Sequence, residues 1–374
     1  MANYDVVQID SLEYDTVAAS SPSIVYIDET HYAIASSGGG LKLRIMEYDA
    51  NYDNIAETTY LLVHSWASGS VSMDKMSDGR LCLACKGQLT GMAYVVEYNV
   101  STYALTLKHS VQTGVTAGTG DYNSIIGLDS THFILACGRS SSSQGRLLTY
   151  LYTPATSTIS GIDSLALYTS AADYVSLIQM DDYKFIASFS GVGDSNYAIF
   201  KSISCDSSYD TLAVEDSLTI TTAYKYQSAV KIDDTHFGCA LQYTLYGFGH
   251  FRTLSFNPST YAMASIDNHE FESSDDWYNS VALLDSNHVA IAFSDTGTSY
   301  SGRITVVEWD ASYDNIANTS TMEFQSSYVS YSSLIYIEDG YLVLAYSGYS
   351  SDGFTKTFTI EIPAGGTSNW FFFI

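Results

Sequence analysis

A repeat of about 50 residues runs through almost the whole chain and constrains its fold more than any other feature. The segment SIVYIDETHYAIA, at Ser23–Ala35, recurs as SIIGLDSTHFILA, SAVKIDDTHFGCA and SVALLDSNHVAIA, and three weaker copies accompany these. Every copy begins with a serine, and the steps between successive serines are 49, 52, 52, 52, 52 and 53 residues. We number the repeat units 1 to 7 after these serines, which are Ser23, Ser72, Ser124, Ser176, Ser228, Ser280 and Ser333. A fixed period of this length indicates an array of equal structural units.

Each unit is predicted to form four short strands. In unit 1 these are SIVYID, HYAIA, LKLRIMEY and TTYLLVH, separated by polar or Gly/Ser-rich turns. Short runs rich in β-branched and aromatic residues favour strands, and no segment shows a sustained helical period. Four strands in about 50 residues are typical of a propeller blade. The sequence therefore resembles a seven-bladed β-propeller, an all-β fold of four-stranded antiparallel blades, over residues 4–363.

The two ends of the chain are expected to meet. Unit 7 stops at Pro363 after three strands, whereas VVQIDSLEYDT precedes Ser23 with the spacing of a fourth strand. We expect the N-terminal strand to complete the last blade, which would cover a sheet edge and close the ring. The predicted domains are the propeller, residues 1–363, and a Gly-rich hinge with an aromatic tail, residues 364–374.

Charge and composition exclude several kinds of partner. Fifteen Lys and Arg against 41 Asp and Glu give a net charge of −26, which argues against binding nucleic acid or anionic lipid. Five scattered cysteines do not make a disulfide framework. The first residues lack the basic and apolar regions of a signal peptide, and the apolar run Trp370–Ile374 is too short to span a membrane. We therefore predict a chain made in the cytoplasm, with neither nucleic acid nor membrane as partner.

Acidic residues and histidines recur at fixed positions of the repeat, and turns are a better interpretation of this pattern than metal sites. An acidic residue usually follows each serine by five positions, and a histidine follows three later in four units: His31, His132, His236 and His288. A ring would spread these groups apart, so we expect Asx turns with each histidine packed on a neighbouring unit. The segments Asp49–Asp53, Asp206–Asp210 and Asp310–Asp314 share the D-x-[NS]-x-D start of a calcium loop but lack its glycine and its final acid. Hairpin turns are the first interpretation and calcium the alternative; no metal or cofactor is predicted.

Aromatic residues mark a candidate ligand site. Tyrosine stands two residues before the serine in five units, and further aromatic residues lie in the adjoining loops. In propellers the first strand of each blade lines the central channel, so the resemblance implies that these side chains surround one mouth. Tyr and Trp faces with hydroxyls and carboxylates suit sugars, although the tyrosines could instead pack between blades and the serines cap strands. The candidate ligand-binding residues are Trp66, Tyr122, Tyr174, Tyr226, Trp277, Tyr278, Tyr331 and Tyr246.

No catalytic motif is found. The sequence lacks the G-x-S-x-G, P-loop, H-E-x-x-H and G-x-G-x-x-G patterns. We predict that the protein is not an enzyme. The alternative is a glycoside hydrolase or polysaccharide lyase that uses carboxylates at the channel mouth, such as Asp121 or Asp275.

The C-terminal segment GGTSNWFFFI predicts an attachment device. It ends in an apolar cluster that a soluble protein normally covers, Trp370, Phe371, Phe372 and Phe373. The cluster could fold back on the propeller, or it could bind other virion proteins or copies of itself. Such an ending is similar to those of tail-fibre and other virion proteins of bacteriophages. This resemblance implies a virion component, a tail-fibre, receptor-binding or decoration protein, that recognises a surface glycan or cell-surface receptor through its aromatic loops.

Overall fold

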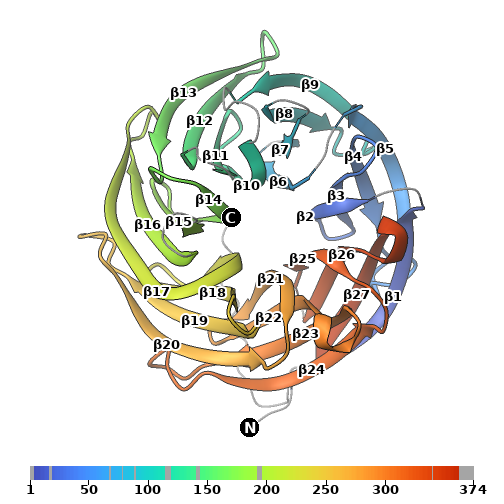
Figure 1. Cartoon of the computed structure of the whole chain (residues 1–374). Coiled ribbons are helices and arrows are strands. Elements are labelled where there is room, and N and C mark those ends of the chain that lie inside the picture. Colours follow the sequence, from blue (N-terminus) through green and yellow to red (C-terminus); the bar gives the residue numbers. More distant parts are fainter. Residues whose placement is uncertain are drawn as a thin grey trace.

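The computed structural model describes residues 4–16, 19–66, 69–77, 79–87, 90–113, 119–139, 144–191, 196–338 and 340–361. Strands dominate this part of the chain, and Figure 1 shows them in sheets arranged radially around a central space. The prediction of an all-β repeat protein is confirmed. The C-terminal cluster Trp370–Phe373 lies outside the described residues, so the predicted division at residue 363 stays a prediction.

The strands follow the repeat. Unit 1 holds β2 (Ser20–Asp28), β3 (His31–Ser37), β4 (Leu41–Glu47) and β5 (Ala56–His64). Unit 2 holds β6 (Val71–Met76), β7 (Arg80–Lys86), β8 (Gly91–Tyr98) and β9 (Leu105–Gln112). Unit 3 holds β10 (Thr119–Gly127), β11 (His132–Arg139), β12 (Arg146–Thr153) and β13 (Thr158–Ala166).

The second half of the chain continues the pattern. Unit 4 holds β14 (Ala172–Asp181), β15 (Lys184–Gly191), β16 (Tyr197–Cys205) and the first half of β17 (Leu212–Lys231). Unit 5 takes the rest of β17 with β18 (His236–Tyr243), β19 (Gly249–Phe256) and β20 (Met263–Glu272). Unit 6 holds β21 (Asp276–Asp285), β22 (His288–Asp295), β23 (Ser301–Glu308) and β24 (Ala317–Gln325). Unit 7 holds β25 (Ser330–Tyr336), β26 (Tyr341–Ser347) and β27 (Gly353–Glu361).

Neighbouring strands within a unit pair antiparallel, and the first strand is innermost. Units 1, 2 and 6 are separate four-stranded sheets, whereas the continuous strand β17 pairs with both β16 and β18 and so joins units 4 and 5. The strand β1 (Asp5–Asp15) pairs antiparallel with β27, with Asp5 opposite Glu361 and Asp15 opposite Gly353. The sheet of unit 7 therefore has the order β1-β27-β26-β25.

The serine column connects successive units. The Ser23 Oγ accepts a hydrogen bond from the Met73 backbone N–H at 3.0 Å, so each serine binds the residue that follows the next serine. At the end of the chain Ser333 accepts from Ile24 at 3.2 Å. The other pairs, at 2.9–3.2 Å, are Ser72–Ile125, Ser124–Leu177, Ser176–Ala229, Ser228–Val281 and Ser280–Leu334. These seven hydroxyls link the innermost strands, including those of units 7 and 1.

An acidic column makes similar connections at the outer strands. Asp10 Oδ2, on β1, accepts from the Ile55 backbone N–H of unit 1 at 2.9 Å. Asp163, Asp216 and Asp267 do the same for the unit that follows each of them, at 2.8–3.2 Å. Units 7 and 1, 3 and 4, 4 and 5, and 5 and 6 are thus connected at their outer as well as their inner strands.

The hydrophobic core lies between the sheets. Among the described residues, each of seven clusters of buried apolar side chains is shared by two successive units, and one joins Ile34 and Met46 of unit 1 to Val343 and Ala345 of unit 7. All five cysteines are buried and free. In the part of the chain that the structure describes, no helix is long and apolar enough to cross a membrane.

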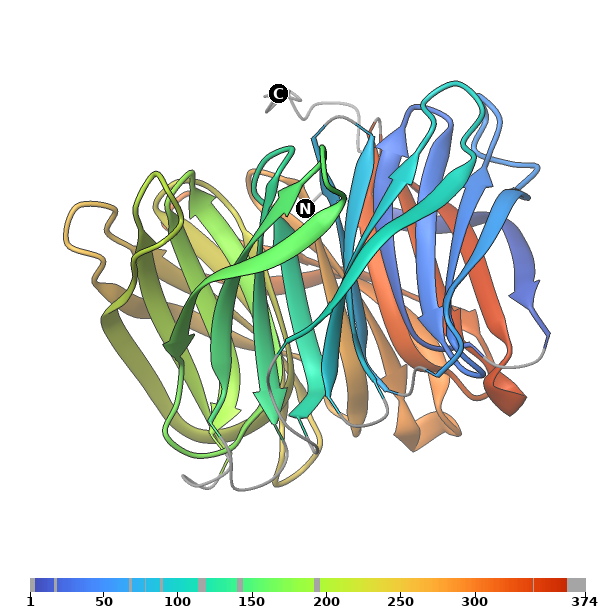
Figure 2. The same ribbon diagram turned by 90° about the horizontal axis from the view of Figure 1, so that it is seen from above.

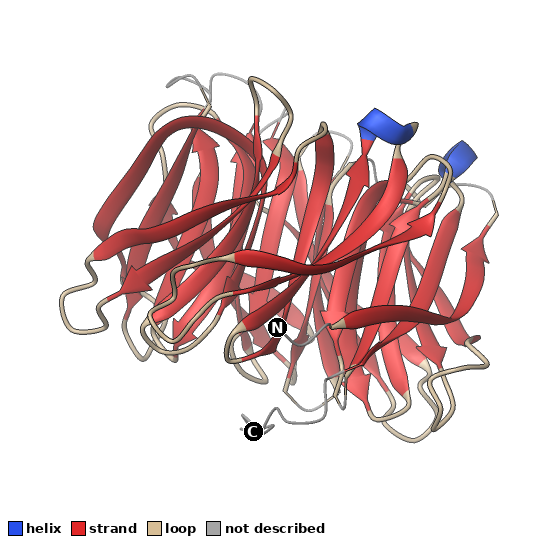
Figure 3. Cartoon of the chain, turned by 90° about the horizontal axis from the view of Figure 1, so that it is seen from below, coloured by secondary structure: helices blue, strands red, loops and turns tan. Residues whose placement is uncertain are grey.

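The two faces of the ring differ. One face, which we call the mouth face, carries the loops between second and third strands and those that lead into the next unit. Figures 2 and 3 show the ring edge-on, with one face at the top and the other at the bottom. The short helices η2 (Thr296–Thr298) and η3 (Tyr349–Ser351), blue in Figure 3, lie together on the mouth face. The opposite face, the turn face, carries the remaining turns.

The Asp and His columns form turns on the turn face, as predicted. Asp233 accepts from the Thr235 backbone N–H at 2.6 Å and lies 3.1 Å from His236 Nδ1. The His236 ring stacks on Tyr313 of unit 6 at 3.5 Å between centroids, and the Tyr313 hydroxyl donates to Asp233 Oδ2 at 2.5 Å. His31 with Tyr103 and His288 with Tyr4 repeat this contact. The histidines therefore pack on neighbouring units.

Replacing Tyr313 by Phe is expected to make the protein more sensitive to acid. Burial by itself raises the pKa of Asp233, but hydrogen bonds from Tyr313 and Thr235 outweigh it, so the net pKa is lowered. A carboxyl group of this kind stabilises the fold at pH values above its pKa in the unfolded chain, which is about 3.9. This contribution is lost as the pH falls through its pKa in the folded protein. Removing the hydroxyl raises the folded pKa. We therefore expect Y313F to lose about 1–2 kcal/mol at neutral pH and to unfold at a higher pH, measured by circular dichroism from pH 6 to pH 2.

The matched control is Tyr261→Phe. Tyr261 takes the same turn position in unit 5, but its ring lies near Lys184 at 5.8 Å instead of a histidine. Its acid transition should coincide with that of the unchanged chain. Equal shifts in both variants would show that the Asp233 hydrogen bond is not the cause.

Candidate functional site

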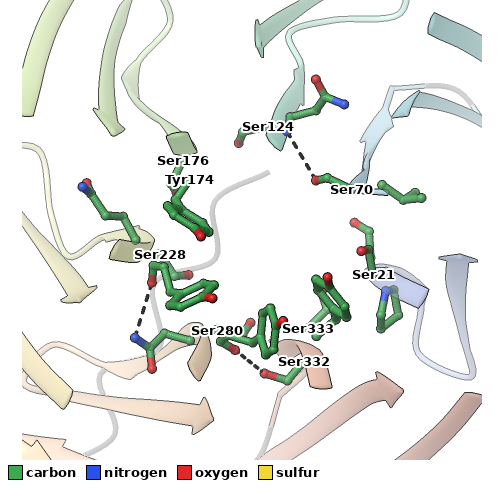
Figure 4. Close-up of a pocket in the computed structure, with 18 of the residues that line it drawn as sticks. Ser21, Ser70, Ser124, Tyr174, Ser176, Ser228, Ser280, Ser332 and Ser333 are labelled. Atoms are coloured by element: carbon green, nitrogen blue, oxygen red, sulfur yellow. Dashed lines mark hydrogen bonds between the residues drawn. The ribbon is translucent and has the colours of Figure 1, made fainter. Parts of the chain in front are cut away.

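A cavity of about 390 Å³ lies at the centre of the mouth face, where the innermost strands begin. Figure 4 shows Tyr174 and serines of all seven units, among them Ser21, Ser124 and Ser333, around this common space. Its remaining lining includes the aromatic residues Tyr226, Tyr278 and Tyr331. The serine and tyrosine columns of the sequence are therefore neighbours in space at one end of the channel.

The four tyrosines lie at irregular points of their strands, where the backbone has a conformation that residues other than glycine rarely adopt. The φ angles of Tyr174, Tyr226, Tyr278 and Tyr331 are 54°, 49°, 59° and 51°. The pairing of each first strand with its neighbour shifts register at the same place, which identifies a β-bulge. A bulky residue in this left-handed region costs roughly 1–3 kcal/mol, and such strain gathers at functional sites. The equivalent Ser21 of unit 1 has a φ of 47° at the same register shift, so the left-handed backbone belongs to the bulge of the repeat, and this bulge fixes the direction of the four rings.

The rings form one continuous arc along half of the mouth. Centroid distances are 4.4 Å from Tyr174 to Tyr226, 4.9 Å from Tyr226 to Tyr278 and 4.2 Å from Tyr278 to Tyr331. Trp277 stacks on Tyr226 at 5.9 Å and extends the arc outwards. We call these five residues the tyrosine arc. On the other half of the cavity the lining is small, with Ser21, Pro22, Gly69 and Ser70.

In units 6 and 7 the residue before the serine holds the bulge of the preceding unit. The Asn279 Nδ2 donates to the Tyr226 carbonyl at 3.3 Å, and the Ser332 hydroxyl donates to the Tyr278 carbonyl at 2.8 Å. These positioning residues were not predicted from the sequence. The position holds Pro, Val, Asn, Val, Gln, Asn and Ser in the seven units, so it gives no recognisable column.

The cavity lining is uncharged. Of the described residues that line it, none is Asp, Glu, Lys, Arg or His. Burial, followed by the nearby Tyr174, raises the pKa of Tyr226, and burial with the nearby Tyr331 raises that of Tyr278. Both phenols are therefore neutral at physiological pH. They present ring faces and hydroxyl groups to whatever enters.

An acidic cluster adjoins the outer end of the arc. The Trp277 Nε1 donates to Asp275 Oδ1 at 3.2 Å, and the Gln242 Nε2 donates to the same oxygen at 2.9 Å. Beside them, Arg303 binds Glu272 at 3.1 Å and Asp295 at 3.0 Å. Asp276 is fully buried, and burial together with the charges of Asp275 and Glu272 raises its pKa. Carboxyl groups therefore outnumber the one guanidinium of this cluster.

Of the three remaining predicted site residues, two lie away from the arc and the side chain of the third is not described. Trp66 is 67% exposed on a loop of the mouth face, and its backbone N–H donates to His64 Nδ1. Tyr246, 60% exposed, belongs to a separate aromatic group with Tyr243 and Phe248. Tyr122 lies on β10, and its side chain, like that of Asp121, is outside the described structure. Five of the eight predicted residues are thus together.

The D-x-[NS]-x-D segments form hydrogen-bonded turns. Asp49 Oδ1 accepts from the Asn51 backbone N–H at 2.8 Å, and Asp49 Oδ2 accepts from Asn54 Nδ2 at 2.8 Å. The segment at Asp310 repeats both contacts. Across the described ranges, no three His, Cys, Asp or Glu side chains are grouped so that they could hold a metal ion.

Comparison with known proteins gives similarity of structure without similarity of sequence. No protein-family model matches the chain, and no curated protein matches it. Among solved structures, Sqt1 of Saccharomyces cerevisiae superposes with a TM-score of 0.57 at 10% identity, covering 93% of this chain and 84% of that one. The C-terminal WD40 domain of Sif2 superposes with a TM-score of 0.55 at 12% identity, covering 97% and 99%.

These structural neighbours contradict the function predicted from the sequence. The prediction of a bacteriophage virion component that recognises glycans is wrong, because the fold is matched by Sqt1 and a WD40 domain and no virion protein supports it. That prediction depended on a short aromatic ending, which carries no information about the fold before it. The similarity shows the fold alone: the chain is a β-propeller repeat protein.

Proposed function

We propose that the protein is a non-enzymatic scaffold that binds a partner protein through the tyrosine arc on the mouth face of a seven-bladed propeller. The serine hydrogen bonds from unit to unit, Ser333–Ile24 included, and the pairing of β1 with β27 support seven blades closed by the N-terminal strand. The structural neighbours are WD40 proteins, which favours an interaction scaffold.

The tyrosine arc is the observation that carries this proposal. Four neutral rings in contact, each held in strained backbone, make a preformed aromatic surface beside a cavity. Tyr and Trp dominate the energetics of protein interfaces because they bury a large area and lose little conformational freedom. A rigid arc also reduces the entropy lost on binding.

Replacing Tyr226, Trp277 and Tyr278 together by Ala is expected to abolish partner binding. Aromatic anchors of this kind contribute about 2–4 kcal/mol each, so affinity should fall at least 100-fold. The full-length chain and the variant are immobilised and compared for proteins retained from cells that make the chain. Isolated partner is then titrated against both.

Tyr183→Ala serves as the control, because Tyr183 is a half-exposed aromatic residue in the turn between β14 and β15 on the turn face. Circular dichroism and thermal unfolding verify that both variants fold. A partner that binds the triple variant and the unchanged chain equally would contradict the proposal. Loss of the same partner from Tyr183→Ala alone would place the interface on the other face.

A further inference from the structure

The tyrosine arc combines features that select a positively charged guest. The described lining of the cavity is neutral, but it belongs to a molecule of net charge −26, whose field concentrates cations at its surface. The acidic cluster of Glu272, Asp275 and Asp295, with Arg303 as its cation, meets the arc at Trp277. The same net charge opposes a second copy of this chain as the occupant.

The chemistry of the lining distinguishes between kinds of cation. No described carboxylate lines the cavity, so a strongly hydrated ammonium would lose its water without a counter-charge. A guanidinium is more weakly hydrated, stacks on aromatic faces and offers five N–H donors in a plane. A phenol or serine hydroxyl oxygen accepts a hydrogen bond from such an N–H group. Tyr174, Tyr226, Tyr278 and Ser70 provide hydroxyl groups in this cavity.

The size of the cavity suits one inserted side chain. A volume of about 390 Å³ is near the lower end of ligand pockets, about 300–1,000 Å³. A helix, at about 10–12 Å across with its side chains, would not enter. An arginine on a loop or a chain end of the partner could enter with its stem between the arc and the small residues Pro22 and Gly69.

We propose that the mouth of the channel receives an arginine side chain of the partner protein. This inference rests on the proposed function and adds the chemistry of the partner. Binding then depends on the positive charge of the guest, its planar guanidinium group and the hydroxyls of the arc.

The test uses the full-length chain and four blocked pentapeptides that differ only at the central residue: Gly-Ser-X-Ser-Gly with X as arginine, lysine, citrulline or glutamate. Affinities are measured by isothermal titration. We expect the arginine peptide to bind about tenfold or more tightly than the lysine and citrulline peptides, since removing the charge or the planar fork removes charge-assisted hydrogen bonds. The glutamate peptide should not bind.

Two variants test the assigned contacts. Tyr226→Phe with Tyr278→Phe keeps both rings and removes both hydroxyls, and it should weaken the arginine peptide about tenfold. Tyr349→Ala, a 74% exposed residue of η3 on the same face but outside the arc, should bind as the unchanged chain does. Thermal unfolding verifies the fold of each.

Equal affinity for arginine and citrulline, or no effect of the double Phe variant, would overturn the arginine assignment. A different result would overturn the proposed function itself: normal binding of the partner protein to the variant in which Tyr226, Trp277 and Tyr278 are replaced by Ala. Loss of the partner from that variant without any binding of the arginine peptide would keep the scaffold and reject the arginine.

Discussion

A chain that lacks residues 1–15 is expected to lose cooperative folding. The deletion removes β1 and with it the buried side chains of Tyr4, Val6 and Tyr14. Burial of three such residues contributes about 5–9 kcal/mol at about 1.5–3 each, comparable with the whole stability of a typical domain. It also exposes β27 as an unpaired edge that invites aggregation. Size-exclusion chromatography and thermal unfolding followed by circular dichroism would show an aggregated chain without a sharp transition.

Adding the missing strand in trans provides the control. A synthetic peptide of residues 1–16 should restore the transition, because it can pair with β27 along the register from Asp5–Glu361 to Asp15–Gly353. The same peptide with Val6 and Tyr14 replaced by Ser should not. A deleted chain that melts as sharply and at the same temperature as the full chain would contradict the role given to β1.

Asp15→Ala is expected to lower the free energy of unfolding by about 3–5 kcal/mol. The Asp15 carboxylate lies 2.6 Å from Lys42 Nζ and 3.0 Å from Arg44 Nη2, and these three side chains are only 5%, 12% and 7% exposed. Removing the carboxylate leaves two buried cations of unit 1 without this anion, and their desolvation is no longer compensated. Denaturation with urea measures the loss.

Glu13→Ala is the matched control, since Glu13 is an exposed acid on the same strand. Its effect should stay within about 0.5 kcal/mol. Similar losses in both variants would mean that the ion pairs between β1 and unit 1 contribute little, and that apolar packing alone holds the two together.

The repeat allowed the fold to be predicted because local signals agreed in every unit. Strand patterns, turn residues and the serine column all recur with one period, so errors in one copy are corrected by the others. The hydrogen bonds of the serines were not predictable in the same way. Their donors are backbone N–H groups of Met73, Ile125 and others, and a backbone donor has no side-chain signature.

The candidate site was predicted in part. The resemblance to a propeller implied that Tyr174, Tyr226, Tyr278 and Tyr331 surround one mouth, but the sequence gave no indication of their left-handed backbone, which local propensity opposes. The outer column of Asp10, Asp163, Asp216 and Asp267 repeats visibly in the fourth strands, yet its role appears only when successive units are placed side by side. Trp66 and Tyr246 were included for their residue type alone, and the fold separates them from the arc.

The serine hydrogen bonds have a consequence for assembly. Every one runs in the same sense, from the hydroxyl of one unit to the amide of the next, so each unit has an accepting edge and a donating edge. A linear series of such units has two unlike ends that are complementary to each other. It must join them within one molecule, as Ser333 and Ile24 do, or add further molecules head to tail into a filament. In this chain the hydrogen bond from Ile24 to Ser333 satisfies both unlike ends at once, beside the pairing of β1 with β27 and the core shared by units 7 and 1.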